Sequence, residues 1–244
     1  MTGHPYAEHP SPNRDARPPG VRPDTLVLHY TGMRSAEAAL ARLCDPAAEV
    51  SAHYLVDEDG TVFALVPEAE RAWHAGRSWW RGRSSLNDVS VGVEIVNPGH
   101  EWGYRPFPEP QTAAVVELAR EIVGRWSIRP WQVVAHSDVA PDRKEDPGEL
   151  FDWRRLAAAG VGLWPEDDEA AGEGSGDAAG ETAARALLAE IGYPLEAQGV
   201  PWPKALAAFQ RRFRPKLVDG LADPGSVSRL RALAGLLRRL GAAS

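Results

Sequence analysis

The sequence contains a single cysteine, Cys44, among 244 residues. A lone cysteine excludes a disulfide within the chain and a metal site built from several thiolates. Because Cys44 lies in an apolar segment with helical spacing, we expect an unreactive thiol inside the fold and not a nucleophile.

Long apolar runs are also missing from the sequence. It has no stretch of about 18 apolar residues, so we expect no membrane-spanning helix. Its first residues are rich in proline and charge and contain no apolar segment of the kind found in signal peptides. We therefore expect residues 1–22 to form a disordered arm and the protein to be cytoplasmic. A periplasmic or outer-membrane location is the alternative if the start of the chain is wrongly assigned.

An excess of positive charge is absent as well, because the formal net charge is -7. This charge argues against a nucleic-acid-binding protein that works through overall basicity. The charge is spread unevenly, with ten basic and four acidic side chains from Arg185 to the end. Residues 166–181 hold seven acidic side chains and four glycines but no basic residue, which predicts a flexible linker between two units.

Apolar periodicity predicts the elements on both sides of that linker. Runs with a two-residue period or high β propensity predict strands at residues 25–30, 52–56, 61–66, 89–96 and 131–135. Helical spacing predicts helices at residues 35–45 and 110–126. Strands and helices do not alternate strictly, so we expect an α+β fold over residues 23–165, a mixed sheet flanked by helices. Three more helical patterns, at residues 183–191, 202–213 and 225–240, predict a small three-helix bundle within residues 182–244.

Two histidines, His29 and His136, stand at the ends of predicted strands, where side chains commonly face a functional cleft. Asp146 follows ten residues after His136, in a charged loop. Two imidazoles and one carboxylate form a familiar ligand set for catalytic zinc, with the fourth position left to water. On spacing alone, three unrelated polar residues are the alternative.

Four motifs then occur in order: HYTG from His29, SAHYLVDEDGTVFALV, AWHAGRSWWRGRSSLNDVSVGVEIVN and AHSDVAPDRKEDPG. Together they resemble the zinc-dependent N-acetylmuramoyl-L-alanine amidases of the AmpD and AmiD type, which share a fold with the peptidoglycan recognition proteins. The resemblance covers about residues 23–164 and implies that His29, His136 and Asp146 bind Zn2+. It also implies that Glu94 is the general base and that Lys144 stabilises the oxyanion.

The residues themselves support one of these roles and leave the other open. Glu94 has apolar neighbours in VGVEIV, where an isolated buried charge is costly, and a costly carboxylate near a metal is a candidate general base. Its alternative is a strand carboxylate that faces solvent. For Lys144 the alternative is a solvated loop lysine.

The resemblance implies hydrolysis of the amide between N-acetylmuramic acid, or its 1,6-anhydro form, and L-alanine of the stem peptide, in peptidoglycan turnover and recycling. Aromatic faces and guanidinium groups suit a glycan that carries an anionic peptide. The candidate substrate contacts are Tyr30, His74, Trp80, Arg81 and Asn87. A purely structural role is the alternative for each of them.

The C-terminal segments KALAAFQRRFRP and VDGLADPGSVSRLRAL resemble a peptidoglycan-binding domain. This second resemblance implies that the partners are muropeptides, anhydro-muropeptides or the intact sacculus. A non-catalytic peptidoglycan recognition protein on the same fold is the alternative function. A hydrolase with a serine nucleophile is disfavoured because the sequence has no G-x-S-x-G elbow.

Overall fold

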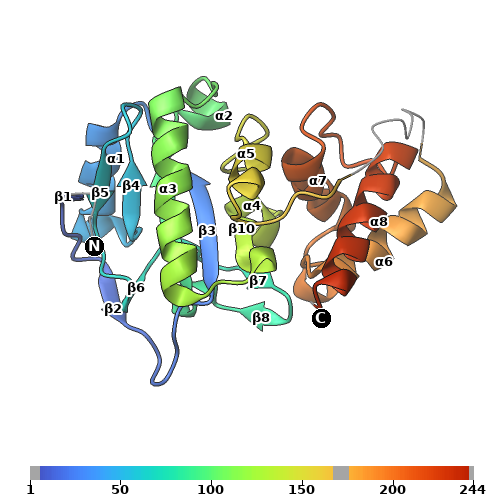
Figure 1. Cartoon of the computed structure of the whole chain (residues 1–244), viewed down its shortest axis with the longest axis horizontal. Helices are drawn as coiled ribbons and strands as arrows, with labels where there is room; N and C mark the ends of the chain where they lie inside the picture. Colours follow the sequence, from blue (N-terminus) through green and yellow to red (C-terminus); the bar gives the residue numbers. More distant parts are fainter. Residues whose placement is uncertain (1–5, 167–175, 242–244) are drawn as a thin grey trace.

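A six-stranded mixed sheet forms the centre of the computed structural model, which describes residues 6–166 and 176–241 (Figure 1). Its strand order is β1-β5-β4-β9-β3-β10, and β4, β9, β3 and β10 are parallel while β5 is antiparallel to β4. The strands are β1 (Ala7–Glu8), β3 (Thr25–Tyr30), β4 (Tyr54–Val56), β5 (Val62–Ala64), β9 (Ser90–Ile95) and β10 (Val133–Ala135). This sheet and the helices around it confirm the predicted α+β class.

Side chains along β3 and β9 alternate between two faces of the sheet, an apolar face and a face that carries His29 and Glu94. Leu26 and Leu28 share one buried cluster with apolar side chains of α3 (Glu109–Trp126), which lies across the sheet in Figure 1. Neighbouring side chains along a strand point to opposite faces. His29 and Glu94, which are partners in the register of β3 and β9, therefore lie on the face opposite α3.

The face that carries His29 is flanked by α1 (Ala36–Leu43). Apolar residues of α1, among them Leu40 and Leu43, pack with Leu55 of β4. The helix begins after Ser35, whose side chain accepts a hydrogen bond from the Ala38 amide, and it ends at Cys44. Cys44 is only partly buried, and burial raises the pKa of its thiol, which keeps the thiol protonated at neutral pH.

Shorter elements surround the sheet and connect its strands. Two small antiparallel pairs are β2 (Arg14–Ala16) with β6 (Glu70–Ala72) and β7 (Trp79–Trp80) with β8 (Arg83–Ser84). The short helices are α2 (Gly99–Trp102), α4 (His136–Val139) and α5 (Trp153–Ala158), with 3-10 turns at Pro46–Ala48, Leu86–Asp88, Pro130–Gln132 and Glu196–Gln198.

The prediction that residues 1–22 form a disordered arm is wrong for residues 6–22, the part that the structure describes. There β1 pairs with β5, and β2 pairs with β6. Arg17 is only 9% exposed. Its guanidinium donates to the backbone carbonyls of Glu68 (3.1 Å), Asn87 (3.1 Å), Asp88 (2.9 Å) and Ser90 (2.7 Å). Proline and charge suggested disorder because composition does not reveal these distant carbonyl partners.

Three C-terminal helices confirm the predicted bundle: α6 (Ala178–Ile191), α7 (Trp202–Phe213) and α8 (Pro224–Arg239). Helix α6 begins five residues earlier than predicted, because the Asp177 side chain accepts a hydrogen bond from the Gly180 amide and caps it. The predicted linker, residues 166–181, therefore overlaps the helix. Residues 167–175 of that linker lie outside the described part of the chain.

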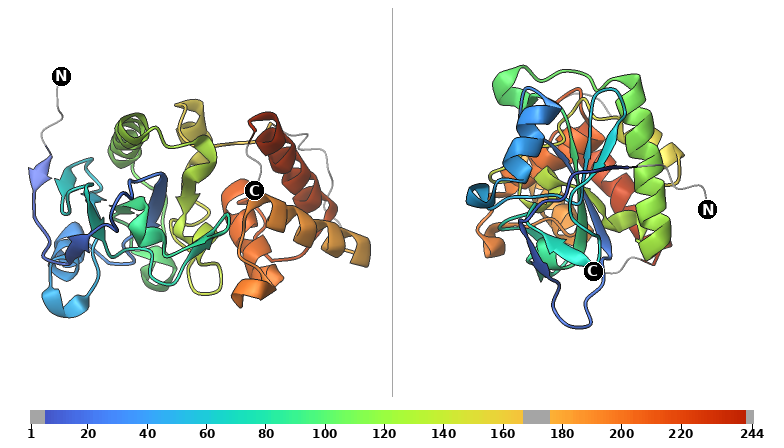
Figure 2. Two further views of the ribbon diagram at one scale, coloured as in Figure 1. Left: turned by 90° about the horizontal axis from the view of Figure 1, so that it is seen from below. Right: turned by 90° about the vertical axis from the view of Figure 1, so that its left-hand side faces the viewer.

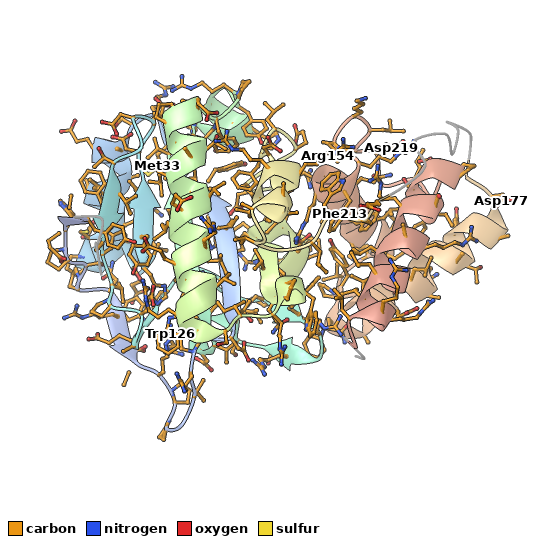
Figure 3. The ribbon with its side chains drawn as sticks, viewed as in Figure 1. Met33, Trp126, Arg154, Asp177, Phe213 and Asp219 are labelled. Atoms are coloured by element: carbon orange, nitrogen blue, oxygen red, sulfur yellow. The ribbon has the colours of Figure 1, made fainter. Side chains whose placement is uncertain are left out.

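The bundle packs directly against the sheet domain, and the two units share one hydrophobic core. Val27, Val134 and Val139 belong to the same buried cluster as Leu206 and Phe209 of α7. Figure 2 shows the three helices against the β10 side of the molecule. Figure 3 labels Arg154 of α5 and Phe213 of α7, which both contact the Trp164 ring. Within residues 6–166 and 176–241, no helix combines the length and apolarity needed to cross a membrane.

Replacement of Arg17 by alanine tests whether the N-terminal segment belongs to the fold. We expect Arg17→Ala to lower the free energy of unfolding by about 2–4 kcal/mol, because several buried carbonyls lose a charged donor. Arg14→Ala is the control, since the Arg14–Glu70 pair is 38% exposed on both sides and its loss should cost at most about 1 kcal/mol. Urea unfolding of both variants gives the comparison. Equal free energies of unfolding for the two variants would support the original prediction of a disordered arm.

Candidate active site

Four side chains of the predicted site come together where four segments of the chain meet. His29 and Glu94 are adjacent on the neighbouring strands β3 and β9. His136 is the first residue of α4, directly after β10, which pairs with β3 on its other side. The Ser137 amide donates to the Asp146 carbonyl (3.0 Å), so the loop that carries Asp146 returns to the start of α4.

His29, His136 and Asp146 bring three ligand atoms to one point, and all three residues are buried. His29 Nδ1 lies 2.8 Å from His136 Nδ1 and 3.1 Å from Asp146 Oδ2, and His136 Nδ1 lies 3.0 Å from the same oxygen. Tetrahedral zinc with bonds of about 2.0–2.1 Å separates its ligand atoms by about 3.3 Å. The spacing of this triad therefore fits one small metal ion.

The hydrogen bonds around His29 determine which of its ring nitrogens carries the proton. Ser90 Oγ donates its only hydrogen to the Leu86 carbonyl (2.6 Å), so it must accept from His74 Nε2 (3.0 Å). Burial lowers the His74 pKa well below its ordinary value, and the neutral ring then accepts at Nδ1 from His29 Nε2 (3.0 Å). Burial also lowers the pKa of His29 to about 4, so its Nδ1 carries no proton.

His136 is oriented in the same way by a backbone group. Its Nε2 lies 3.2 Å from the carbonyl of Ala75, which can only accept a hydrogen bond. In the neutral ring, Nδ1 is therefore unprotonated and faces the triad. Two imidazole lone pairs and a carboxylate oxygen repel one another at these distances, and a cation between them removes the repulsion. Ligating histidines are typically held in this way through the second ring nitrogen.

Gly92 gives His74 the room to reach His29. A Cβ atom at Gly92 would lie 2.5 Å from the His74 ring, so the ring occupies the space above this strand glycine. Glycine inside a strand often marks such a close approach. The glycine in VGVEIV was the available sequence signal for this contact.

Glu94 presents a carboxylate with one unsatisfied oxygen beside the triad. Its Oε2 is buried and has no hydrogen-bond partner among the described residues. Burial, together with the charge of Asp146, raises the pKa of Glu94 well above its ordinary value, and Lys144 acts in the opposite direction. A buried carboxylate with a free oxygen is suited to taking up a proton from a group in the cleft.

The cleft above these groups has a volume of about 260 Å³. Of the predicted residues, Tyr30, His74, Glu94 and Lys144 line it together with His136 and Asp146. Sequence reasoning missed Met33, Arg42 and Trp73, which also line it. Trp73 could have been found as the neighbour of His74 in AWHAG, whereas Arg42, like Glu37, is an exposed charge on α1 with no such signal.

Trp80 and Arg81 do not lie in the cleft, which corrects their prediction as substrate contacts. Trp80 is buried, its Nε1 donates to the Trp131 carbonyl (3.1 Å), and its ring lies 5.1 Å from that of Tyr193. The Arg81 guanidinium donates to the Ile191 carbonyl (2.6 Å). Both side chains therefore bind the C-terminal helices, because the β7–β8 hairpin docks on the bundle.

Asn87 does not line the cleft, but it supports the site through hydrogen bonds to a neighbouring backbone segment. Its Oδ1 accepts hydrogen bonds from the amides of His74 (3.1 Å) and Ala75 (2.7 Å). Through these two bonds it holds the segment whose side chain and carbonyl orient His29 and His136. A purely structural role, the alternative given for this residue, therefore describes Asn87 better than a substrate contact does.

Comparison with known proteins places these features in a family. The family model described as N-acetylmuramoyl-L-alanine amidase matches residues 19–149. The amidase AmiD of Escherichia coli (strain K12) is 39% identical over 228 residues, which cover 86% of this chain and 82% of that protein.

Two solved structures extend the likeness to the whole chain. The complex of AmiD from E. coli with anhydro-N-acetylmuramic acid-L-Ala-D-gamma-Glu-L-Lys matches with a TM-score of 0.79 and 36% identity, covering 92% of this chain and 93% of that one. AmpDH3 from Pseudomonas aeruginosa in complex with anhydromuramic pentapeptide matches with a TM-score of 0.74 and 33% identity, covering 95% and 97%. The family uses a metal in general, in agreement with the His-His-Asp group. The chain belongs to the N-acetylmuramoyl-L-alanine amidase family and is an amidase of the AmpD/AmiD type.

Proposed function

We propose that this amidase depends on zinc and cleaves the amide between anhydro-N-acetylmuramic acid and L-alanine of a muropeptide. The observation that carries the proposal is the convergence of three buried ligand atoms beside the free carboxylate oxygen of Glu94. The anhydro form is favoured because the similar AmiD and AmpDH3 chains were solved with anhydro-muropeptides.

His29 and His136 would hold the zinc ion through Nδ1, and Asp146 would hold it through Oδ2. Two nitrogen ligands favour zinc over calcium or magnesium, which prefer all-oxygen sites. When bound in such a site, zinc supplies Lewis-acid polarisation of a carbonyl and makes water more acidic. His74 accepts a hydrogen bond from His29 Nε2 and thereby keeps the proton of His29 on that nitrogen.

The protein's own residues carry the proton and stabilise the charge. Glu94 takes a proton from the water that attacks the amide carbonyl, and Lys144 stabilises the negative charge that develops on the carbonyl oxygen. As the C–N bond breaks, Glu94 returns the proton to the leaving nitrogen of L-alanine. The products are the free muramic acid carboxylate and the free stem peptide.

Trp73 and Arg42, which line the cleft, take the substrate-binding roles first expected of Trp80 and Arg81. An indole face packs against sugar or lactyl groups, and a guanidinium pairs with a stem-peptide carboxylate. Tyr30 contributes a further aromatic wall to the same cleft. Binding of the intact sacculus by the C-terminal helices and a cytoplasmic location stay predictions from the sequence.

Replacement of His136 tests the proposed metal ligands. We expect His136→Ala to lose bound zinc and hydrolysis of a soluble anhydro-muropeptide together, because two remaining ligands seldom retain a catalytic zinc ion. The exposed His9 is the control, and His9→Ala should keep one zinc per chain. Metal analysis after dialysis gives the stoichiometry, and full occupancy in His136→Ala would remove His136 from the ligand set.

Replacement of Glu94 separates proton transfer from metal binding. Glu94→Gln keeps the shape of the side chain but cannot accept the proton, so we expect kcat to fall by about 10²-fold or more while zinc stays bound. Steady-state hydrolysis and metal analysis of the same preparation provide both readouts. Loss of zinc in this variant would make Glu94 a ligand, and an unchanged kcat would end its role as base.

A further inference from the structure

Asp138 is a completely buried carboxylate that lies two residues after His136. Its Oδ2 accepts hydrogen bonds from the Ala135 amide (2.8 Å) and from Arg212 Nη1 (2.7 Å), and its Oδ1 accepts one from the Tyr193 hydroxyl (2.6 Å). A buried charge is costly without such partners. Two of the three come from the C-terminal helical unit and not from the domain that contains Asp138.

The short helix α4 connects Asp138 to the catalytic groups. Its first residue is His136, and the amide of its second residue, Ser137, holds the Asp146 carbonyl at 3.0 Å. The amide of Lys144 donates to the Ala140 carbonyl at the end of the same helix (3.0 Å). A shift of α4 therefore moves His136 and the loop that carries Lys144 and Asp146 at the same time.

Tyr193 and Arg212 are themselves held firmly in the interface. Burial, with the charge of Asp138, keeps the pKa of Tyr193 well above its ordinary value, so its hydroxyl stays a donor at neutral pH. The Tyr193 ring packs edge-on against Trp80. The Arg212 guanidinium lies 4.1 Å from the centre of the Trp153 ring. Both donors thus approach Asp138 from fixed positions.

A second contact reaches the ligand loop itself. Arg211, the neighbour of Arg212 on α7, lies 3.2 Å from a carboxylate oxygen of Glu145 and 3.6 Å from one of Glu149. Glu145 stands between Lys144 and Asp146 in the sequence. The C-terminal helical unit therefore contacts the loop through Arg211 and contacts α4 through the hydrogen bonds of Tyr193 and Arg212 to Asp138.

We propose that the C-terminal helices complete the active site: Tyr193 and Arg212 are positioning residues that act through Asp138 to hold α4 and its zinc-ligand loop. This inference rests on the zinc site proposed above. It gives the bundle a role in catalysis on small soluble substrates, apart from any contact with the cell wall.

Tyr193→Phe in the full chain tests this role, because it removes one hydroxyl and leaves the packed ring in place. We expect the zinc dissociation constant, measured by competition with a chelator, to rise about tenfold, the scale seen when outer-shell support of a metal site is lost. On a soluble anhydro-muropeptide, kcat should fall while KM stays unchanged, since the cleft residues are untouched. Tyr6→Phe is the matched control, because it removes a tyrosine hydroxyl that donates a hydrogen bond to Glu121, far from the site.

A double-variant cycle shows whether the effect passes through Asp138. If it does, Tyr193→Phe adds little to the loss of zinc affinity in Asp138→Asn, whereas independent effects would add and contradict the proposal. Zinc affinity and kcat of Tyr193→Phe equal to those of Tyr6→Phe would overturn it as well. A wild-type chain that binds no zinc would instead refute the zinc site itself and this inference with it.

Discussion

Two imidazole nitrogens and one carboxylate oxygen face one another at the centre of this protein, and the surrounding structure holds them there. Left alone, the two imidazole nitrogens and the carboxylate oxygen would separate or take up protons. The chain of bonds from His29 through His74 and Ser90 to the Leu86 carbonyl keeps the proton of His29 on the far side of its ring. The Ala75 carbonyl does the same for His136. The proposed metal requirement rests on these proton positions.

The fold supplies this arrangement through three layers of support. The register of β3 and β9 places His29 beside Glu94, and the pairing of β10 with β3 brings His136 to the same edge. Around them, Asn87 holds the segment that orients both histidines. Farther out, the C-terminal helices hold Asp138 under α4. Each layer consists of buried polar groups with specific partners, which limits how far the site can move.

The sequence predicted best those features that depend on local periodicity. The strand carrying His29, the strand carrying Glu94 and the three C-terminal helices all have clear patterns, and the structure confirms them. Sequence reasoning failed where a residue's role depends on a distant partner. Arg81 belongs to the interface because it meets the Ile191 carbonyl, 110 positions away. Arg17 orders the N-terminal segment through carbonyls at least 51 positions away. Neither partner leaves a signal near the residue itself.

The protonation state of the two histidines tests the origin of the metal site most directly. Long-range 1H–15N correlation spectra of the protein labelled in histidine distinguish the two ring tautomers and show which nitrogen binds zinc. We expect His29 and His136 to carry their proton on Nε2 at neutral pH and to bind zinc through Nδ1. A proton on Nδ1 of His29 in the metal-loaded protein, or zinc bound through Nε2, would contradict the arrangement from which the zinc site was inferred.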